Sequence, residues 1–208
     1  MTSFSDDEGR IAVVIARSAV EGHVRNERPS EVDAPSAFEK KSGVFVTLST
    51  HPGDELRGCI GYPEPVAPLM RALTESAISA ASRDPRFPPV SVDELDRITV
   101  EVSLLTPPEE IVTEEQSSLP EQISVGEDGL IVERGGARGL LLPQVPVEWN
   151  WDPEEFLCQT CMKAGVGPDA WLMPDTRVFR FRAEVFSETE PRGNIVRRDL
   201  RERHGCSR

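Results

Sequence analysis

The sequence predicts an α+β fold with an antiparallel or mixed sheet flanked by helices. Segments with alternating apolar residues, which are typical of strands, follow one another directly or across short turns. The segments with helical periodicity lie between groups of strands, without the regular strand-helix-strand rhythm of a parallel sheet. The length of 208 residues allows one domain, or one domain with two lobes.

The first predicted element is a helix over residues 11–24. Ser5 or Asp6 can cap its N-terminus, and the acidic residues Asp7 and Glu8 suit the positive end of the helix dipole. His23 is expected at the surface. The apolar face is predicted to include Ile11, Val14, Ile15, Ser18 and Ala19. A polar loop with two prolines over 26–36 then leads to the next element.

A hairpin is predicted next. Residues 43–49 alternate in polarity like a strand, and residues 50–54 contain the turn formers Pro52, Gly53 and Asp54. The strand over 56–60 follows at once, so the two strands should pair. His51 would lie near the turn and not necessarily near Cys59, although it is the one histidine placed locally enough for a Cys-His hydrolase.

A second helix is predicted over residues 68–82, and the prolines of segment 83–89 end it. Ser91 and Glu94 have the spacing of a capping box and predict a short helical turn. Residues 98–105 alternate cleanly and predict a half-buried strand. One face of the second helix is expected to carry Leu69, Leu73, Ala77, Ala80 and Ala81.

The second half of the chain begins with the acidic segment 106–122, which we expect to be a surface connection. Two apolar stretches, 130–133 and 139–142, flank a Gly-Gly centre that favours a hairpin. Asp152, followed by proline and glutamate, predicts a helix start, with Gly165 as its stop. Residues 177–185 predict the last strand, with Phe179, Phe181, Ala183 and Val185 facing the core.

The charge balance narrows the classes of partner. A net charge of −13 argues against a general nucleic-acid or anionic-membrane binder. No apolar run approaches the roughly 20 residues of a membrane helix, and the N-terminus lacks a basic leader. We therefore expect a cytoplasmic protein. Residues 191–208 form a basic tail with six arginines, predicted to be solvated and partly helical.

The stretch Leu-Arg-Gly-Cys-Ile-Gly at 56–61 is the most unusual part of the sequence. Gly58 and Gly61 indicate a positive φ or a close approach of the backbone. In an extended strand, Arg57 and Cys59 point to the same face, where a guanidinium would favour the reactive thiolate. The two are candidate catalytic residues and the glycines candidate binding residues. The alternative is a buried structural cysteine beside an ion-paired arginine.

Four further polar residues are candidates for binding or acid–base roles. Asp84 and Arg86 belong to a segment that could bind a carboxylate or phosphate, or form an ion-paired helix end with Phe87 in the core. Glu64 and Glu101 could act as acid or base, although a surface or strand carboxylate is the simpler interpretation.

The cysteine pair further along the chain predicts helix packing rather than chemistry. Cys158 and Cys161 would lie inside a helix, whereas a reactive motif of this spacing begins one. A zinc site also needs about four ligands, and no second pair has suitable spacing. The sequence thus predicts no metal site and no cofactor.

Four stretches together resemble the AMMECR domain family. They are the motif at 56–61, Asp-Pro-Arg-Phe-Pro-Pro at 84–89, Gly-Leu-Leu-Leu-Pro-Gln-Val at 139–145, and the segment from Trp151-Asp152 to Cys161-Met162-Lys163-Ala164-Gly165. The resemblance implies one domain over residues 8–190 with a larger and a smaller lobe and a cleft between them. It also implies a functional role for the motif at 56–61.

Two classes of function follow. The first is an enzyme or enzyme component that uses Cys59 with Arg57. The second is a non-catalytic binding or scaffold module for a peptide, an anionic small molecule or a partner protein. The resemblance further implies an association with Memo-type and radical-SAM proteins. Neither the residues nor the resemblance predicts which class applies.

Overall fold

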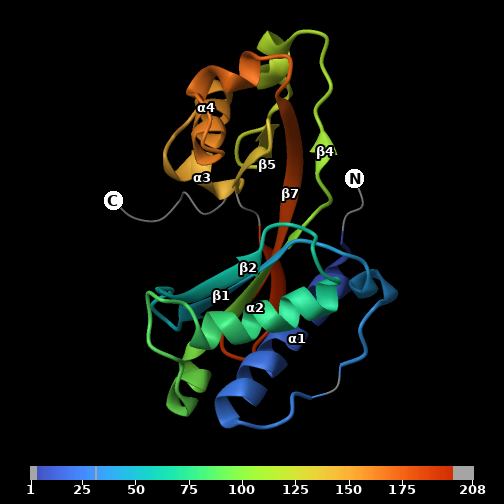
Figure 1. Ribbon diagram of the computed structural model, residues 1–208. Coiled ribbons are helices and arrows are strands. Elements are labelled where there is room, and N and C mark those ends of the chain that lie inside the picture. The colour runs from blue at the N-terminus through green and yellow to red at the C-terminus, as the bar shows by residue number, and fades with distance from the viewer. Residues whose placement is uncertain (1–3, 31, 199–208) are drawn as a thin grey trace. The chain divides into compact units, whose positions relative to one another are not determined.

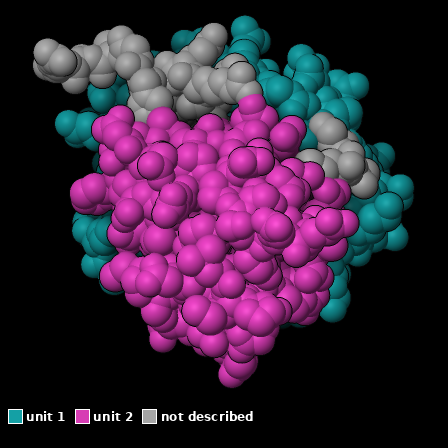
Figure 2. All heavy atoms as spheres, turned by 90° about the horizontal axis from the view of Figure 1, so that it is seen from above, with its two compact units in different colours: residues 1–105, 184–199 teal, residues 106–183, 200–208 magenta. Residues whose placement is uncertain are grey.

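The computed structural model describes residues 4–30 and 32–198 and confirms the α+β class (Figure 1). It divides into two compact units, coloured separately in Figure 2. Within the described residues, the larger unit 1 comprises 4–105 and 184–198, and unit 2 comprises 106–183. Strand β7 (Arg177–Glu188) supplies residues to both. The single domain expected over 8–190 stays a prediction.

Unit 1 is built on an antiparallel sheet whose outermost strand carries the cysteine motif. The order is β2 (Leu56–Tyr62), β1 (Val44–Thr50), β3 (Ile98–Leu105) and the end of β7. The predicted hairpin of β1 and β2 is confirmed. Strand β8 (Ile195–Arg198) pairs with β7, so this part of the expected tail is a strand and not helical. The tail from residue 199 lies outside the described residues.

Two long helices, α1 (Asp6–Arg25) and α2 (Leu69–Ser82), pack on one face of this sheet (Figure 1). Ser5 caps α1 through the capping box with Glu8, and the predicted face of α2 is buried. The face predicted for α1 is partly wrong, because Val14 is 44% exposed. Since α1 is covered by both α2 and the sheet, its buried residues form a wider set: Ala12, Val13, Ile15, Ala16, Ala19 and Val20.

Two short 3-10 turns complete unit 1. They are η1 (Ser36–Glu39), in front of β1, and η2 (Val92–Arg97), in front of β3. Ser91 and Glu94 form the predicted capping box of η2. This box fixes the chain at the entrance to β3, whose alternating apolar residues are buried as expected.

Unit 2 contains the predicted second hairpin and the predicted later helix. Strands β5 (Asp128–Arg134) and β6 (Ala137–Leu141) pair across two glycines with positive φ, +56° and +85°. Helix α4 (Pro153–Lys163) begins at the Asp152 cap, where the backbone N–H of Glu155 donates to Oδ1 over 2.8 Å. The short helix α3 (Gln144–Glu148) and the 3-10 turn η4 (Pro168–Leu172) have no counterpart in the sequence prediction.

Two predictions for unit 2 need correction. Segment 106–122 is more than a surface connection, because it forms β4 (Glu109–Glu110) and η3 (Gln116–Gln122) and fully buries Leu119. Strand β7 buries Phe181 and Val185 as predicted, but it also buries Val178 and leaves Phe179 and Ala183 half-buried, with the Arg177 guanidinium over the Phe179 ring. One strand that serves two cores does not keep a single buried face along its length. Within 4–30 and 32–198, no helix combines the length and apolar character needed to cross a membrane.

Candidate functional site

The candidate site lies on the sheet face of unit 1 that α1 and α2 leave uncovered. Thr47 on β1 stands opposite Cys59 on β2 and opposite Glu101 on β3. Because side chains directly opposite one another share a face, the three residues form one row across three strands. All three are half-buried, whereas the neighbouring Val46 and Val102 point into the core. The Thr47 hydroxyl donates a hydrogen bond to Cys59 Sγ over 3.2 Å.

Asp84 and Arg86 hold the backbone of Cys59 from the other side. The N–H of Cys59 donates to Asp84 Oδ2 over 2.8 Å, and Arg86 Nη2 donates to the Cys59 carbonyl over 3.4 Å. Strand β2 is the outermost strand of its sheet, and these bonds satisfy its outward backbone groups where another chain could otherwise pair. The segment after α2 therefore caps the sheet edge at the cysteine.

The Asp84 carboxylate binds both the Cys59 backbone and the Arg86 side chain. Its side chain is only 2% exposed, yet it also accepts bonds from the Arg86 backbone N–H, Nε and Nη2 at 3.1, 2.9 and 2.7 Å. The Arg86 hydrogen bonds are the main reason that the pKa of Asp84 is held well below its usual range. Asp84 is therefore ionised in the folded protein and positions both Arg86 and Cys59.

The thiol of Cys59 is kept in its neutral form. Burial is the largest cause of a raised pKa, and the nearby carboxylates of Asp84 and Glu101 raise the pKa further. The Thr47 hydroxyl and the Arg86 guanidinium act in the opposite direction, but they do not outweigh burial. A thiol that is protonated at neutral pH is a weak nucleophile at rest.

Arg57 does not have the partner that the sequence suggested. The pairing register shifts so that Leu48 faces Gly58 and Ser49 faces Leu56, which leaves Arg57 as the extra residue of a β-bulge. Its guanidinium is committed to Glu94, with Nε 2.7 Å from Oε1 and Nη2 3.3 Å from Oε2.

This ion pair has two consequences for the electrostatics of unit 1. The Arg57 hydrogen bond is the main cause that lowers the pKa of Glu94 to about 2. The cation that acts on the Cys59 thiol is Arg86 and not Arg57. Both guanidiniums lie near the ring of Phe87, at 5.9 Å for Arg57 and 5.5 Å for Arg86.

The two motif glycines are explained by close packing rather than by positive φ. A Cβ on Gly58 would lie 2.2 Å from the carbonyl oxygen of Ala80 in α2. A Cβ on Gly61 would lie 2.3 Å from the carbonyl oxygen of Val44 and 2.5 Å from the Phe45 ring. The glycines therefore let the motif strand sit tightly against α2 and β1. Their expected role in ligand binding stays a prediction.

The remaining candidates lie apart from the row. Glu64 follows β2 in the turn toward α2, and His51 lies in the β1–β2 turn. Cys161 is fully buried in α4, and burial raises its pKa to about 11, in agreement with the packing role predicted for it. Among residues 4–30 and 32–198, no three His, Cys, Asp or Glu side chains gather as a metal site would require.

Two residues that contact the candidate site residues were missed from the sequence. Thr47 alternates in phase with Phe45 and Ser49, so the strand pattern placed it on the open face, but only the pairing register puts it opposite Cys59. Glu94 was assigned to its capping box, and its carboxylate also binds Arg57 through both oxygens. Such pairs between distant segments leave no local sequence signal.

The comparisons with a family model, with related sequences and with a solved structure agree with one another. The AMMECR1 family model matches residues 13–186. A protein of Methanothermobacter thermautotrophicus is 60% identical over 186 residues, covering 88% of this chain and 96% of its own. A protein of Thermococcus kodakarensis is 54% identical, covering 96% of this chain and 100% of its own. The crystal structure of an uncharacterised Pyrococcus horikoshii protein is 50% identical with a TM-score of 0.79, covering 94% and 98% of the two chains.

Proposed function

The chain belongs to the AMMECR1 family, whose matched relatives are uncharacterised, and from this premise we propose that it is a non-catalytic binding module. The binding surface is the open sheet face of unit 1, centred on Thr47, Cys59 and Glu101. Asp84 and Arg86 hold its backbone at Cys59 through hydrogen bonds, which suits a preorganised binding surface.

The pairing of both nearby arginines with carboxylates, Arg57 with Glu94 and Arg86 with Asp84, is the observation that carries this proposal. A resting nucleophile needs a base or a cation that stabilises the thiolate. Burial, Asp84 and Glu101 outweigh the opposing effects of Thr47 and Arg86 on the pKa of Cys59. The cation expected from the sequence, Arg57, is bound to Glu94.

The chemistry of the surface indicates a partner that offers hydrogen-bonding groups. The row presents a hydroxyl, a thiol and a carboxylate, while Arg57 is paired with Glu94 and Arg86 with Asp84. An anionic small molecule, one of the ligands expected from the sequence, would have to compete with Glu94 for Arg57 and with Asp84 for Arg86. We propose a partner protein, and the Memo-type and radical-SAM proteins implied by the family resemblance are the first to test.

A thiol-dependent enzyme is the second candidate, and one observation favours it. Two groups that favour a thiolate are in place, because Thr47 donates to Cys59 Sγ and the Arg86 guanidinium opposes the rise in pKa that burial causes. A substrate that neutralised Glu101 would shift the balance toward the thiolate. In this scheme Arg86 takes the role first given to Arg57.

Partner binding can be tested with three variants. Calorimetric titration of the Memo-type and radical-SAM proteins of the same organism should show binding to the wild type. Glu101→Lys reverses a charge on the surface and should abolish binding. Val14→Lys, at an exposed position of α1, is the matched control and should bind like the wild type. Cys59→Ser should bind within about twofold if the thiol is not the reacting group.

The outcomes separate the two candidates. Equal binding by Glu101→Lys and wild type, with unchanged circular dichroism, would refute this surface. A turnover reaction that survives in Glu101→Lys but disappears in Cys59→Ser would support the enzyme instead.

A further inference from the structure

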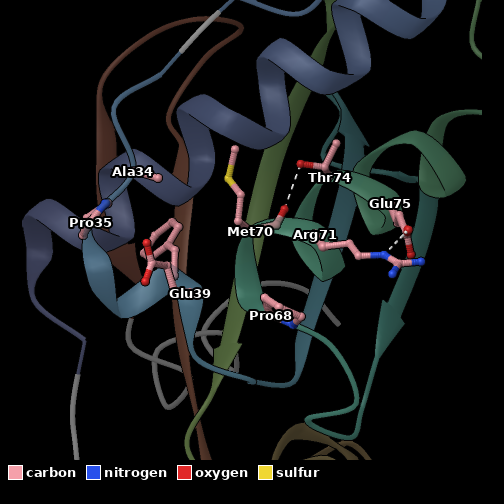
Figure 3. A pocket seen from close by; sticks show the side chains of 9 residues that line it. Ala34, Pro35, Glu39, Pro68, Met70, Arg71, Thr74 and Glu75 are labelled. Atoms are coloured by element: carbon pink, nitrogen blue, oxygen red, sulfur yellow. Dashed lines mark hydrogen bonds and ion pairs between the residues drawn. The ribbon is translucent and has the colours of Figure 1, made fainter.

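Unit 1 also contains a pocket that does not include the row of Thr47, Cys59 and Glu101. An open pocket of about 610 Å³ is formed by η1, the residues before it and the first half of α2 (Figure 3). Its volume falls within the roughly 300–1,000 Å³ of small-molecule sites. The apolar part of its lining consists of Ala34, Pro35, Phe38, Pro68 and Met70.

In the part of the chain that the structure describes, two of the three charged residues that line the pocket pair with each other, and the third does not. Arg71 Nε donates to Glu75 Oε1 over 2.8 Å, and the Tyr62 hydroxyl donates to Glu75 Oε2 over 2.7 Å. The Thr74 hydroxyl donates within α2 to the Met70 carbonyl. Glu39, on η1, makes no ion pair with any residue in 4–30 or 32–198. In Figure 3 it lies across the pocket from the Arg71–Glu75 pair, with Met70 between them.

We propose that this pocket binds an organic cation: an ammonium group on a short apolar body. The apolar body would lie on Met70, Pro68 and Pro35, and the ammonium group would pair with Glu39. The argument rests on charge complementarity, because Arg71 and Glu75 already neutralise each other and Glu39 leaves one negative charge at the pocket. The site adds to the proposed function and does not depend on Cys59.

Tyr62 on the motif strand is linked to the pocket through Glu75, which lines it and accepts a hydrogen bond from the Tyr62 hydroxyl. Tyr62 is the last residue of β2 and the single tyrosine of the chain. Its hydrogen bond to Glu75 is the largest cause of its raised pKa. Because Glu75 lines the same pocket, occupation of the pocket changes the surroundings of this hydrogen bond, and one carbon-13 resonance from labelled tyrosine reports it.

The probe is n-hexylammonium, with n-hexanoate and hexan-1-ol as probes of matched length. Saturation transfer from the full-length protein gives each dissociation constant, and the Tyr62 resonance locates the binding. We expect hexylammonium to bind about two- to fivefold more tightly than hexan-1-ol, the factor that a partly exposed ion pair provides. Hexanoate should bind most weakly, because its charge repels Glu39.

Three variants complete the test. Glu39→Gln should weaken hexylammonium binding about two- to fivefold and leave hexan-1-ol unchanged. Ala34→Trp should fill the exposed mouth and remove the binding of both. Glu27→Gln, an exposed glutamate outside this pocket, is the control and should change nothing. Absence of saturable binding, equal binding of hexanoate and hexylammonium, or an unchanged affinity in Glu39→Gln would each overturn the proposal.

Discussion

Replacing Asp84 with asparagine tests how the cysteine strand is held. The change removes the charge from a carboxylate that is 2% exposed and accepts bonds from the Cys59 N–H and from three donors of Arg86. Breaking a fully buried ion pair costs about 3–5 kcal/mol, and an exposed pair contributes about 0–1 kcal/mol. Because Arg86 is 53% exposed, we expect an intermediate loss in the free energy of unfolding, about 2–3 kcal/mol.

A double-mutant cycle isolates the pair itself. Arg86→Met keeps the apolar stem but leaves Asp84 buried with two backbone donors, and it should cost about 1–3 kcal/mol. The double variant should be more stable than the sum of the single changes predicts, by about 1–2 kcal/mol. The assay is urea unfolding followed by circular dichroism, because all three tryptophans lie in unit 2 and do not report on unit 1.

The pH dependence of the same variants gives an independent check. A carboxylate whose folded pKa is depressed adds stability above its unfolded pKa, about 3.9, and this stability is lost as the pH falls. The difference in free energy of unfolding between the wild type and Asp84→Asn should therefore decrease progressively as the pH falls below about 4. A loss under about 0.5 kcal/mol for Asp84→Asn at neutral pH, or strict additivity with Arg86→Met, would refute the reasoning.

Three further predictions concern stability. Gly58→Ala should lower the free energy of unfolding by about 1–3 kcal/mol, because the new Cβ meets the Ala80 carbonyl in α2. In the control Gly167→Ala the new Cβ meets no atom within 4 Å, so the change should stay within about 0.5 kcal/mol. Equal unfolding free energies for the two variants would contradict the close-packing argument. Asp152→Ala should cost about 0.5–2 kcal/mol, measured by tryptophan fluorescence during thermal unfolding; an unchanged melt would remove the cap assignment. In Glu94→Gln, the free energy of unfolding should decrease less between about pH 4.3 and pH 2 than in the wild type, because the Arg57 pair lowers the pKa of Glu94 to about 2. The same decrease in both proteins would contradict this assignment.

The sequence predicted those helix starts and strands well whose structure depends on residues close together in the chain. The capping box at Ser91 and the Asp152 cap need residues only three positions apart, so they were identified without tertiary information, whereas the cap of α1 was left open between Ser5 and Asp6 and proves to be Ser5. The strand β3 was found for the same reason, because its alternation is complete within eight residues. The short strand β8 was missed, because its four residues gain strand structure only by pairing with β7.

The sequence named several residues that the structure brings into contact, but it did not predict which of them pair; their functional role stays a prediction. The sequence identified Cys59, Asp84 and Arg86, and the structure brings them together. It paired Cys59 with Arg57 by strict alternation, and the β-bulge at Arg57 invalidates that inference. Glu94, 37 positions away, then provides the true partner, which no periodic pattern indicates.

The pH dependence of Cys59 alkylation tests the central claim most directly. The rate of reaction with iodoacetamide, followed for the peptide that contains Cys59 by mass spectrometry, depends on the fraction of thiolate. Because burial raises the pKa of this thiol, we predict an apparent pKa above that of an unperturbed cysteine and slower alkylation at neutral pH than for a model thiol. An apparent pKa below that of an unperturbed cysteine, with faster alkylation at neutral pH, would contradict the binding module and favour the thiol-dependent enzyme.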